Sequence, residues 1–398
     1  MTAEREYLGS HPWLTFDYRI DFDVKDQLWA RLGEAFAQCQ HLTGTPLTPA
    51  VAEELGAVYL AKGAMATTAI EGNTLSEQEV AEIISGGRTL PPSRRYLQQE
   101  VENVVAALRA VDDNSRHGGT AITVDWIKRQ NRQMLADLET DDHVQPGEFT
   151  TTGLVVGTYR GAPPRDVPYL MDRLVDWIAR LTDGNDQQPA TVRFFGAFLA
   201  ATLSHLYLAW IHPFGDGNGR TARLLECAIL TNSGLVPWVS ANLLSDHYNR
   251  TRSEYYRRLS NASRHGDVTG FLGYAAQGFV DQLREQIELV QRHQLRVSWI
   301  NFVHERFRCL PNTEATARQR TLLLSLPDGP TPLNAVRRLT PELAEQFAGR
   351  SDKTVTRDIN RLQSLGLAVV DRRTIAPAIH LMAAFIPGRA TTPPDDRG

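Results

Sequence analysis

The spacing of apolar residues along the chain predicts helices over most of its length. Apolar residues recur about every three to four positions over residues 24–108, 167–181, 191–211 and 271–302. This period puts them on one face of a helix, and that face can pack into a core. Within residues 24–302, residues 146–164 follow a different pattern. We therefore expect a mainly α-helical protein.

The pattern of residues 146–164 predicts strands. Residues 148–153 and 154–159 are rich in threonine and valine and are interrupted by glycine. This pattern is typical of a β-hairpin. It is compatible with a purely structural hairpin, and also with an edge that aligns an extended segment of another protein by strand pairing.

The C-terminal part of the chain contains shorter elements. We expect a helix over residues 315–326, a short helix that begins at Thr340 and Pro341, and a helix from Ser351 to Gly366. Strands are expected over residues 367–370 and 379–382. A helix-turn-helix followed by a hairpin is typical of a winged helix.

This predicted module carries a modest excess of basic residues. Six basic residues against three acidic ones lie between positions 350 and 373; the basic ones are Arg350, Lys353, Arg357, Arg361, Arg372 and Arg373. A basic helix and wing suit DNA phosphates, but winged helices also dock proteins, so both partners stay open. Residues 387–398 are rich in proline, threonine and charges, which predicts a disordered tail.

Composition limits the classes of protein that remain. The chain has 398 residues, a net charge of -4 and 22% charged residues, which argues against a nucleic-acid coat along the whole chain. The three cysteines are scattered without a C-x-x-C pair, so neither a disulfide framework nor a zinc site is predicted. The N-terminus lacks the plan of a signal peptide, and no apolar run is expected to reach membrane-spanning length. We expect a cytoplasmic protein with no membrane partner.

The reactive side chains gather in residues 211–223, Ile-His-Pro-Phe-Gly-Asp-Gly-Asn-Gly-Arg-Thr-Ala-Arg, which we call the signature loop. It separates two apolar helical segments. Gly217 and Gly219 permit a tight turn whose N–H groups, together with the start of the next helix, face one point and suit an anion. Arg220 and Arg223 are three residues apart on that helix, so both can reach the same anionic oxygens.

Two further side chains complete this chemistry. Asp216 is placed to hold a hydrated divalent cation that bridges phosphates, as Mg²⁺ prefers. His212, with an ordinary pKa of about 6.5, can take a proton from a hydroxyl that attacks phosphorus. Taken singly, these features are typical of a structural histidine, a turn and a solvated basic face. Their order between two apolar helices favours a polyphosphate site.

The signature loop resembles, at every position, the H-x-F-x-D/E-G-N-G-R-x-x-R signature of the Fic (Fido) family, whose typical members transfer AMP from ATP to a protein hydroxyl. By this resemblance His212 is the general base, Phe214 anchors the loop in the core and Asp216 binds Mg²⁺. The residues that it implies in nucleotide binding are Gly217, Asn218, Gly219, Arg220, Thr221, Ala222 and Arg223. Family members that phosphorylate tend to carry Lys at the position of Gly219, so nucleotidyl transfer is favoured here.

A second motif precedes this core. Residues 67–72, Thr-Thr-Ala-Ile-Glu-Gly, fit the S/T-x-x-x-E-G/N inhibitory motif of many Fic proteins. The resemblance implies that Glu71 pairs with Arg223 and occupies the guanidinium that the γ-phosphate needs. Thr67, on the same helix face, is expected to brace that carboxylate or to donate to a phosphate. The alternative is a surface carboxylate at the end of a helix.

Other assignments by resemblance are less specific. The predicted hairpin corresponds to the family's flap, which aligns a target segment, although Thr150 stands where members often have Arg. Asn249 corresponds to an Asn that contacts the adenosine, with a capping or surface Asn as the alternative. His205 lies among apolar neighbours and is expected to be packed in the core.

We therefore expect four segments. Residues 1–115 form an N-terminal helical region with the inhibitory motif, 116–305 a Fic-type helical core with a hairpin flap, 312–386 a winged helix-turn-helix and 387–398 the tail. The expected function is an autoinhibited, Mg²⁺-dependent protein adenylyltransferase, which moves AMP from ATP to a Ser, Thr or Tyr hydroxyl of a target protein or of itself. The alternatives are AMP removal from a modified protein and a nucleotide-sensing DNA-binding regulator. The target, the donor nucleotide and a homodimer stay open.

Overall fold

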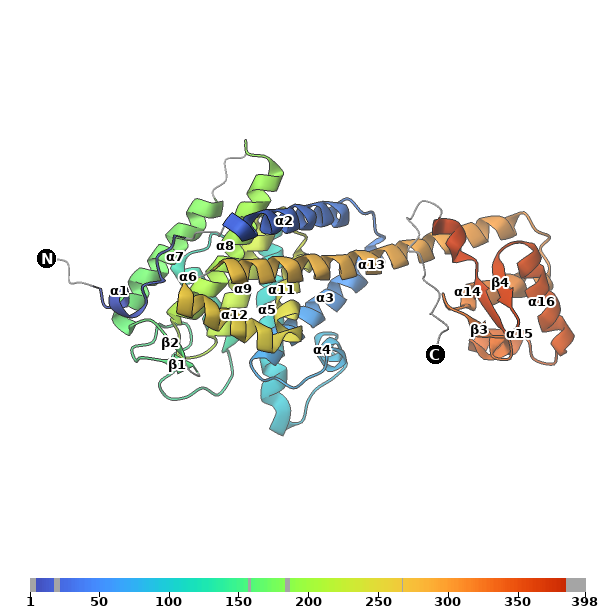
Figure 1. The fold of residues 1–398 in the computed structure, drawn as a ribbon. Helices are drawn as coiled ribbons and strands as arrows, with labels where there is room; N and C mark the ends of the chain where they lie inside the picture. Colours follow the sequence, from blue (N-terminus) through green and yellow to red (C-terminus); the bar gives the residue numbers. More distant parts are fainter. Residues whose placement is uncertain (1–4, 18–21, 157–158, 183–186, 267, 384–398) are drawn as a thin grey trace, which may run out of the picture. The chain divides into compact units, whose positions relative to one another are not determined.

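The computed structural model describes residues 5–17, 22–156, 159–182, 187–266 and 268–383 (Figure 1). The chain divides into two compact units, residues 1–287 and 288–398, and each is described by itself. The predicted disordered tail, residues 387–398, lies outside the described residues.

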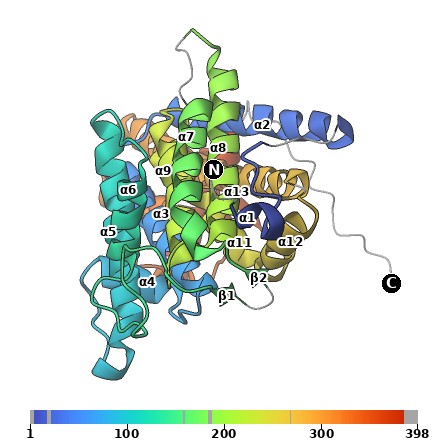
Figure 2. The same ribbon diagram turned by 90° about the vertical axis from the view of Figure 1, so that its left-hand side faces the viewer.

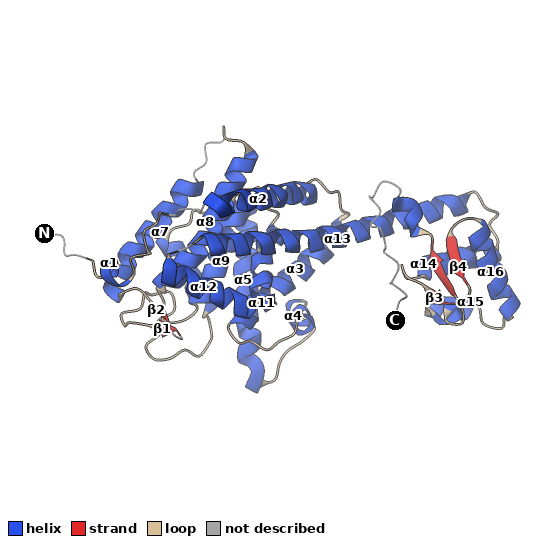
Figure 3. Cartoon of the chain, viewed as in Figure 1, coloured by secondary structure: helices blue, strands red, loops and turns tan. Residues whose placement is uncertain are grey.

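The first unit is built almost entirely of helices, as Figure 3 shows. The predicted helical class is therefore confirmed. Its helices are α1 (Tyr7–Ser10), α2 (Phe22–Thr43), α3 (Pro49–Ile70), α4 (Glu77–Ile84), α5 (Arg95–Arg116), α6 (Val124–Met134), α7 (Val167–Thr182), α8 (Ala190–Ile211), α9 (Asn218–Asn232), α10 (Trp238–Ala241), α11 (Leu243–Arg250), α12 (Arg252–His265) and the first part of α13 (Thr269–Arg308).

Helix α8 is the core of this unit. It packs against both α7 and α9, which lie near it in Figure 2, and most of its side chains are buried. With 22 residues and a mean hydropathy of 1.6, it is long and apolar enough to cross a membrane, so the expectation that no run reaches that length was wrong. However, 83% of its apolar window is buried inside the protein, which is what the core helix of a helical bundle requires.

The ends of α3 and α4 follow the sequence signals. Thr48 and Pro49 begin α3, and Gly72 follows its last turn with a φ of +107°, a conformation that glycine adopts without strain. Ser76 accepts from the Glu79 N–H and the Glu79 carboxylate accepts from the Ser76 N–H, so the two residues form a capping box at the start of α4. The segment between the two helices is therefore short and fixed at both ends.

The predicted hairpin differs in register. β1 (Val155–Val156) pairs antiparallel with β2 (Tyr159–Arg160), so Val155 lies opposite Arg160, whereas the prediction paired residues 148–153 with 154–159. Phe149 instead forms a single bridge with Phe214 of the signature loop. The error arose because the Thr-Thr-Thr-Gly run has strand composition, whereas its first residue, Thr150, donates its N–H to the Pro213 carbonyl of the signature loop.

The second unit combines helices with a small sheet. Its further elements are α14 (Glu314–Ser325), β3 (Thr331–Pro332), α15 (Pro341–Gln346), α16 (Asp352–Ser364), β4 (Ala368–Asp371), β5 (Thr374–Pro377) and the short 3₁₀ helix η4 (Ile379–Ala383). The sheet is antiparallel with the order β3-β5-β4. The predicted strand over residues 379–382 is wrong, because those residues form η4 and the partner of β4 begins directly after Arg373.

Candidate active site

The signature loop is held rigidly between α8 and α9. His212 ends α8 in the left-handed conformation, with φ of 52°, and its N–H donates to the Leu208 carbonyl at 2.9 Å. Phe214 is 1% exposed and anchors the loop in the core. The Asn218 side chain closes the turn with two hydrogen bonds to the Phe214 backbone. Its Oδ1 accepts from the Phe214 N–H at 3.0 Å, and its Nδ2 donates to the Phe214 carbonyl at 2.7 Å. The loop thus has a fixed shape before any ligand binds.

The His212 ring is oriented as a base. Its Nδ1 lies 3.4 Å from the Ala209 carbonyl oxygen, which can only accept, so Nδ1 bears the proton and Nε2 is left free to accept one. Burial lowers the pKa of His212 below its ordinary value, while the Ala209 carbonyl and the charges of Glu71 and Asp216 act in the opposite direction. The ring is therefore neutral near pH 7.

Gly217 turns the chain into α9. Its φ is +75°, and a Cβ there would lie 2.9 Å from Asn131 Nδ2, so both the conformation and the space favour glycine. Asn131 also donates to the Asp216 carbonyl at 2.9 Å and accepts from the Gly147 N–H at 2.9 Å. Thr221 and Ala222 are fully buried, so their side chains support α9 from the core. The N-terminus of α9 with its positive dipole end is thereby presented at the turn.

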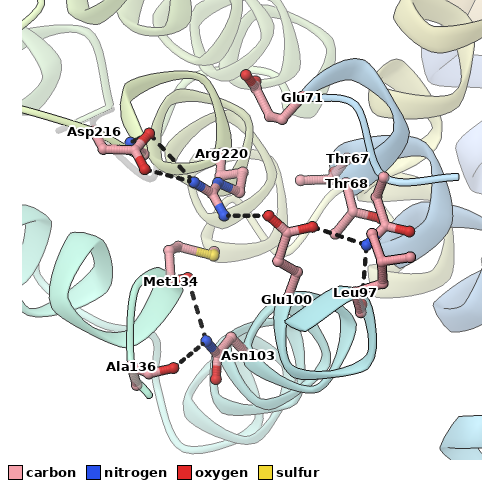
Figure 4. A network of polar contacts seen from close by, with 12 residues as sticks. Thr67, Thr68, Glu71, Leu97, Glu100, Asn103, Met134, Ala136, Asp216 and Arg220 are labelled. Carbon is pink, nitrogen blue, oxygen red and sulfur yellow. Dashed lines mark hydrogen bonds and ion pairs between the residues drawn. The ribbon is translucent and has the colours of Figure 1, made fainter. Parts of the chain in front are cut away.

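Asp216 and Arg220 belong to one polar network, which Figure 4 shows. Arg220 Nη2 lies 3.3 Å from Asp216 Oδ2, and its Nη1 lies 3.4 Å from Glu100 Oε1 on α5. Glu100 in turn accepts from Asn73 Nδ2 at 2.8 Å, and Asn73 also donates to the Leu97 carbonyl at 2.9 Å. The orientation of the Arg220 guanidinium is thus fixed by carboxylates on two sides. Glu100 is a residue that the sequence reasoning missed.

Glu71 and Arg223 form a close ion pair. Glu71 Oε1 accepts from Arg223 Nη2 at 2.5 Å, and the same nitrogen donates to the Thr67 carbonyl at 3.0 Å. The Arg223 side chain is 1% exposed and that of Glu71 is 34% exposed, so the pair seals the buried end of an open cavity. A Cβ at Gly219 would collide with the Glu71 carboxylate, so glycine is required for this approach. Thr67 contributes its backbone carbonyl to this contact.

The Glu71 carboxyl remains ionised in this setting. Burial by itself raises its pKa, but the charge and hydrogen bond of Arg223 outweigh this effect and the pKa is lowered overall. The end of α3 is also fixed from α12, because Arg252 Nη2 donates to the Ile70 carbonyl at 2.6 Å and the Tyr256 hydroxyl donates to the same oxygen at 3.3 Å. The end of α3, which carries Glu71, is therefore held in place by α12.

An open cavity of about 990 Å³ brings some of these groups together, but Asp216, Gly217 and Arg220 are not among its lining residues. Its lining includes five of the residues singled out from the sequence, namely Glu71, His212, Asn218, Gly219 and Arg223. The volume is that of a small-molecule site, since such sites typically measure about 300–1,000 Å³. Asn249 is not among the lining residues, and its Nδ2 contacts Met65 Sδ at 3.8 Å.

Several lining residues come from segments that sequence reasoning did not connect with the loop. Helix α12 contributes Tyr255, Tyr256 and Ser263, and the N-terminal segment contributes His11 and Trp13. The Tyr255-Tyr256 pair carries no local signal that indicates which part of the protein it faces. Such contacts depend on tertiary packing.

Comparison with known proteins adds to this geometry. Residues 121–230 match the family model described as the Fic/DOC family. The chain is 33% identical over 214 residues to the protein adenylyltransferase fic-1 of Caenorhabditis elegans, covering 53% of this chain and 38% of that protein. It is 30% identical over 211 residues to the protein adenylyltransferase Fic of Nematostella vectensis, covering 53% and 45%. The chain thus spans less than half the length of these curated relatives.

Solved structures resemble a larger part of the chain. The structure of Fic-1 from C. elegans has a TM-score of 0.54 and 27% identity, covering 68% of this chain and 74% of that one. A Fic family protein from Desulfovibrio desulfuricans has a TM-score of 0.55 at 22% identity, covering 90% of this chain and 97% of that one, and it supports the fold alone.

Proposed function

Because residues 121–230 form a Fic/DOC-family domain, we propose that this chain is a protein adenylyltransferase that Glu71 holds in an inhibited state. It transfers AMP from ATP to a Ser, Thr or Tyr hydroxyl of a target protein or of itself and releases pyrophosphate. The observation that carries the proposal is the ion pair of Glu71 with Arg223, which lies in the same cavity as His212. A triphosphate needs that guanidinium, so the pair and the nucleotide compete.

Different groups of the site bind the phosphates and transfer the proton. The N-terminus of α9 and the two arginines hold the phosphates, because unpaired N–H groups and guanidinium groups suit anionic oxygens. His212 Nε2 takes the proton of the attacking hydroxyl as its oxygen bonds to the α-phosphorus. The bond between the α-phosphorus and the bridging oxygen breaks, and that oxygen leaves with the pyrophosphate.

Asp216 suits a hydrated Mg²⁺. Its side chain is 52% exposed, and no cluster of three or more His, Cys, Asp or Glu residues that could hold a metal occurs in the described part of the chain. Mg²⁺ keeps several waters and is commonly bound by one or two carboxylates together with substrate phosphates. When bound, it neutralises charge on the phosphates. The contacts of Asp216 with Arg220 and the Gly217 N–H orient the carboxylate for this role.

The hairpin β1–β2 is proposed as the flap that presents the target hydroxyl. It is tied to the loop region through the Tyr159 hydroxyl, which donates to the Trp210 carbonyl at 2.7 Å, and through the Ala162 N–H, which donates to the Ile211 carbonyl at 3.1 Å. Val155 is 62% exposed. An exposed two-stranded edge beside the base suits an extended target segment paired by backbone hydrogen bonds.

A second candidate function concerns the C-terminal unit, which we propose is a winged helix that binds DNA. Its support is the exposure of the basic residues on α16 and on the β4–β5 turn, Lys353, Arg357, Arg361, Arg372 and Arg373. A basic helix face next to a basic turn suits phosphates on a duplex. Docking of a target protein is the competing role of this unit.

Label transfer tests the catalytic proposal. The Glu71→Gly variant, incubated with α-labelled ATP, Mg²⁺ and a cell lysate, should label protein, and γ-labelled ATP should not. His212→Ala in the same background should lower the labelling rate at least about a hundredfold, the typical contribution of a general base. Its control is His143→Ala, since His143 is an exposed histidine of the same unit.

Three results would contradict the proposal. Near-parental labelling by the His212→Ala variant would contradict the role of His212 as the general base. Transfer of the γ-label would show that the reaction is phosphorylation and not nucleotidyl transfer. Loss of label from modified protein on addition of the unmutated chain, without any labelling by Glu71→Gly, would assign AMP removal instead.

A further inference from the structure

The carboxylate of Glu100 lies beside a site that we propose binds phosphates. Its Oε1 lies 3.4 Å from Arg220 Nη1, and Arg220 Nη2 lies 3.3 Å from Asp216 Oδ2, so the guanidinium has a carboxylate on each side (Figure 4). A carboxylate so close to a phosphate-binding arginine weakens the attraction of that arginine for an anion. The proposed chemistry gives Glu100 no role, so its presence calls for a reason.

Glu100 is held in position by the turn that follows α3. Its second oxygen, Oε2, accepts from Asn73 Nδ2 at 2.8 Å, and the same nitrogen donates to the Leu97 carbonyl at 2.9 Å. Asn73 Oδ1 accepts from the Leu75 N–H at 3.0 Å, and Asn73 is 7% exposed. The Asn73 amide is thus fixed at both ends, and it keeps Glu100 Oε1 directed at Arg220.

The three charged side chains differ in exposure. The Arg220 side chain is 5% exposed, that of Glu100 is 19% exposed and that of Asp216 is 52% exposed. A buried guanidinium needs a counter-charge, because an unpaired buried charge is strongly destabilising. Glu100 is the more buried of the two carboxylates and is anchored by Asn73, so it can supply that charge without Asp216.

The charges of this group do not cancel. Two carboxylates and one guanidinium leave one net negative charge, and Asp216 is the carboxylate that is half exposed, directly before α9. If Glu100 were uncharged, Arg220 would have Asp216 as its carboxylate partner and the group would be neutral. A divalent cation would then meet a carboxylate that a buried guanidinium already neutralises.

We propose that Glu100 is a positioning residue that balances the charge of Arg220 and so leaves the Asp216 carboxylate for a divalent cation. The inference rests on the proposed function, because it takes Asp216 to bind the Mg²⁺ that accompanies a nucleoside triphosphate. Mutation of a group that contacts a metal ligand typically costs about 10–100-fold in metal affinity. Glu100 acts through Arg220, so the effect expected here is at the lower end of this range.

The ATP dissociation constant of the full chain, measured with Mg²⁺ and with EDTA, tests this. We call the ratio of the EDTA value to the Mg²⁺ value the Mg²⁺ gain. In the Glu71→Gly background, adding Glu100→Gln should lower the Mg²⁺ gain about tenfold. In EDTA the same variant should bind ATP at least as tightly as its parent, because a negative charge beside the phosphate site is removed. A merely structural role would weaken ATP binding in both conditions alike and leave the Mg²⁺ gain unchanged.

The matched control is Glu102→Gln, the same substitution at an exposed position of the same helix, α5. It should keep the parental Mg²⁺ gain. Equal Mg²⁺ gains in the Glu100→Gln and Glu102→Gln variants would overturn the inference.

A second comparison decides the question even if Glu100→Gln alone does not fold. Once Arg220→Gln has removed the guanidinium, Glu100 has no charge left to balance, so adding Glu100→Gln to Arg220→Gln should not change the Mg²⁺ gain. The double variant also leaves no buried guanidinium without its counter-charge. A tenfold lower Mg²⁺ gain in the double variant than in Arg220→Gln would show that Glu100 acts independently of Arg220 and would overturn the inference.

The outcomes separate the inference from the function on which it rests. If the Glu71→Gly background shows a Mg²⁺ gain but transfers no label, the proposed function fails, and the role of Glu100 is still decided by the Mg²⁺ gain of its variants. If that background transfers label but shows no Mg²⁺ gain, the inference is overturned and nucleotidyl transfer stands.

Discussion

His212 and Gly217 hold left-handed backbone conformations that decide where the neighbouring groups point. His212 has φ of 52° and Gly217 has φ of 75°. Glycine adopts this conformation freely, but a histidine pays roughly 1–2 kcal/mol for it. The His212 N–H bond to Leu208 is kept in this conformation, and Gly161 leaves the space beside it, since a Cβ at Gly161 would lie 3.0 Å from the His212 Cβ. The strained residue is the proposed base, which is where strained conformations tend to gather.

The pH dependence of label transfer follows from the lowered pKa of His212. Burial disfavours the imidazolium form, so the base is neutral, and active, down to a pH below its ordinary value of about 6.5. Activity of the Glu71→Gly variant should be constant near neutral pH and should fall as the pH drops through that lowered pKa. A kcat profile between pH 5 and about 8 measures it, and an acidic limb with its midpoint above 7 would contradict the assignment.

At the scale of elements, the sequence predicted best where a local signal decides. The capping box at Ser76 and the end of α3 at Gly72 are set by residues adjacent in the chain, and both are present. The hairpin register was mispredicted, because Phe149 pairs with Phe214, a residue distant in sequence. The signature loop was recognisable because its residues are contiguous. Glu100 was not, because it meets Arg220 only after α5 and α9 have packed.

The C-terminal unit contains a buried ion pair that joins two of its helices. Arg318 Nε on α14 donates to Asp358 Oδ2 on α16 at 2.7 Å, and Gln319 Nε2 donates to Asp358 Oδ1 at 2.8 Å. Both charged side chains are almost completely buried, at 6% and 2% exposure. The pair therefore joins the two helices on which the basic face depends.

Removing one partner should leave the other charge buried and uncompensated. Asp358→Ala is expected to lower the unfolding free energy of this unit by about 3–5 kcal/mol. Urea unfolding followed by circular dichroism measures it. The matched control is Asp352→Ala, at an exposed residue of the same helix, with an expected change within about 0.5 kcal/mol. Equal changes in the two variants would show that the pair adds nothing to stability.

At the scale of the whole molecule, a unit with a proposed nucleotide site and a unit with an exposed basic face occur in one chain. The proposed DNA role predicts that the full chain binds duplex DNA with an affinity that falls steeply with salt, because each neutralised phosphate releases counterions. Replacing Arg372 and Arg373 with alanine should reduce the salt slope by about one unit per lost contact.

A gel-shift titration at two salt concentrations measures this slope. The control replaces the exposed Arg116 and Arg129 of the first unit, which removes the same charge and should leave the slope unchanged. Absence of DNA binding at low salt would contradict the DNA role. Altered target labelling after deletion of the unit would then indicate a protein-docking role.

The central claim is that Glu71 and ATP compete for Arg223, and the ATP dissociation constant in the presence of Mg²⁺ tests it most directly. Glu71→Gly removes the carboxylate that lies 2.5 Å from Arg223 Nη2, so the account predicts at least about tenfold tighter ATP binding together with the onset of label transfer. Glu71→Gln keeps the length of the side chain but not its charge, so its ATP dissociation constant should lie between those of the unmutated chain and of Glu71→Gly. Equal ATP affinity in the unmutated chain and in Glu71→Gly, with no gain in labelling, would contradict the account.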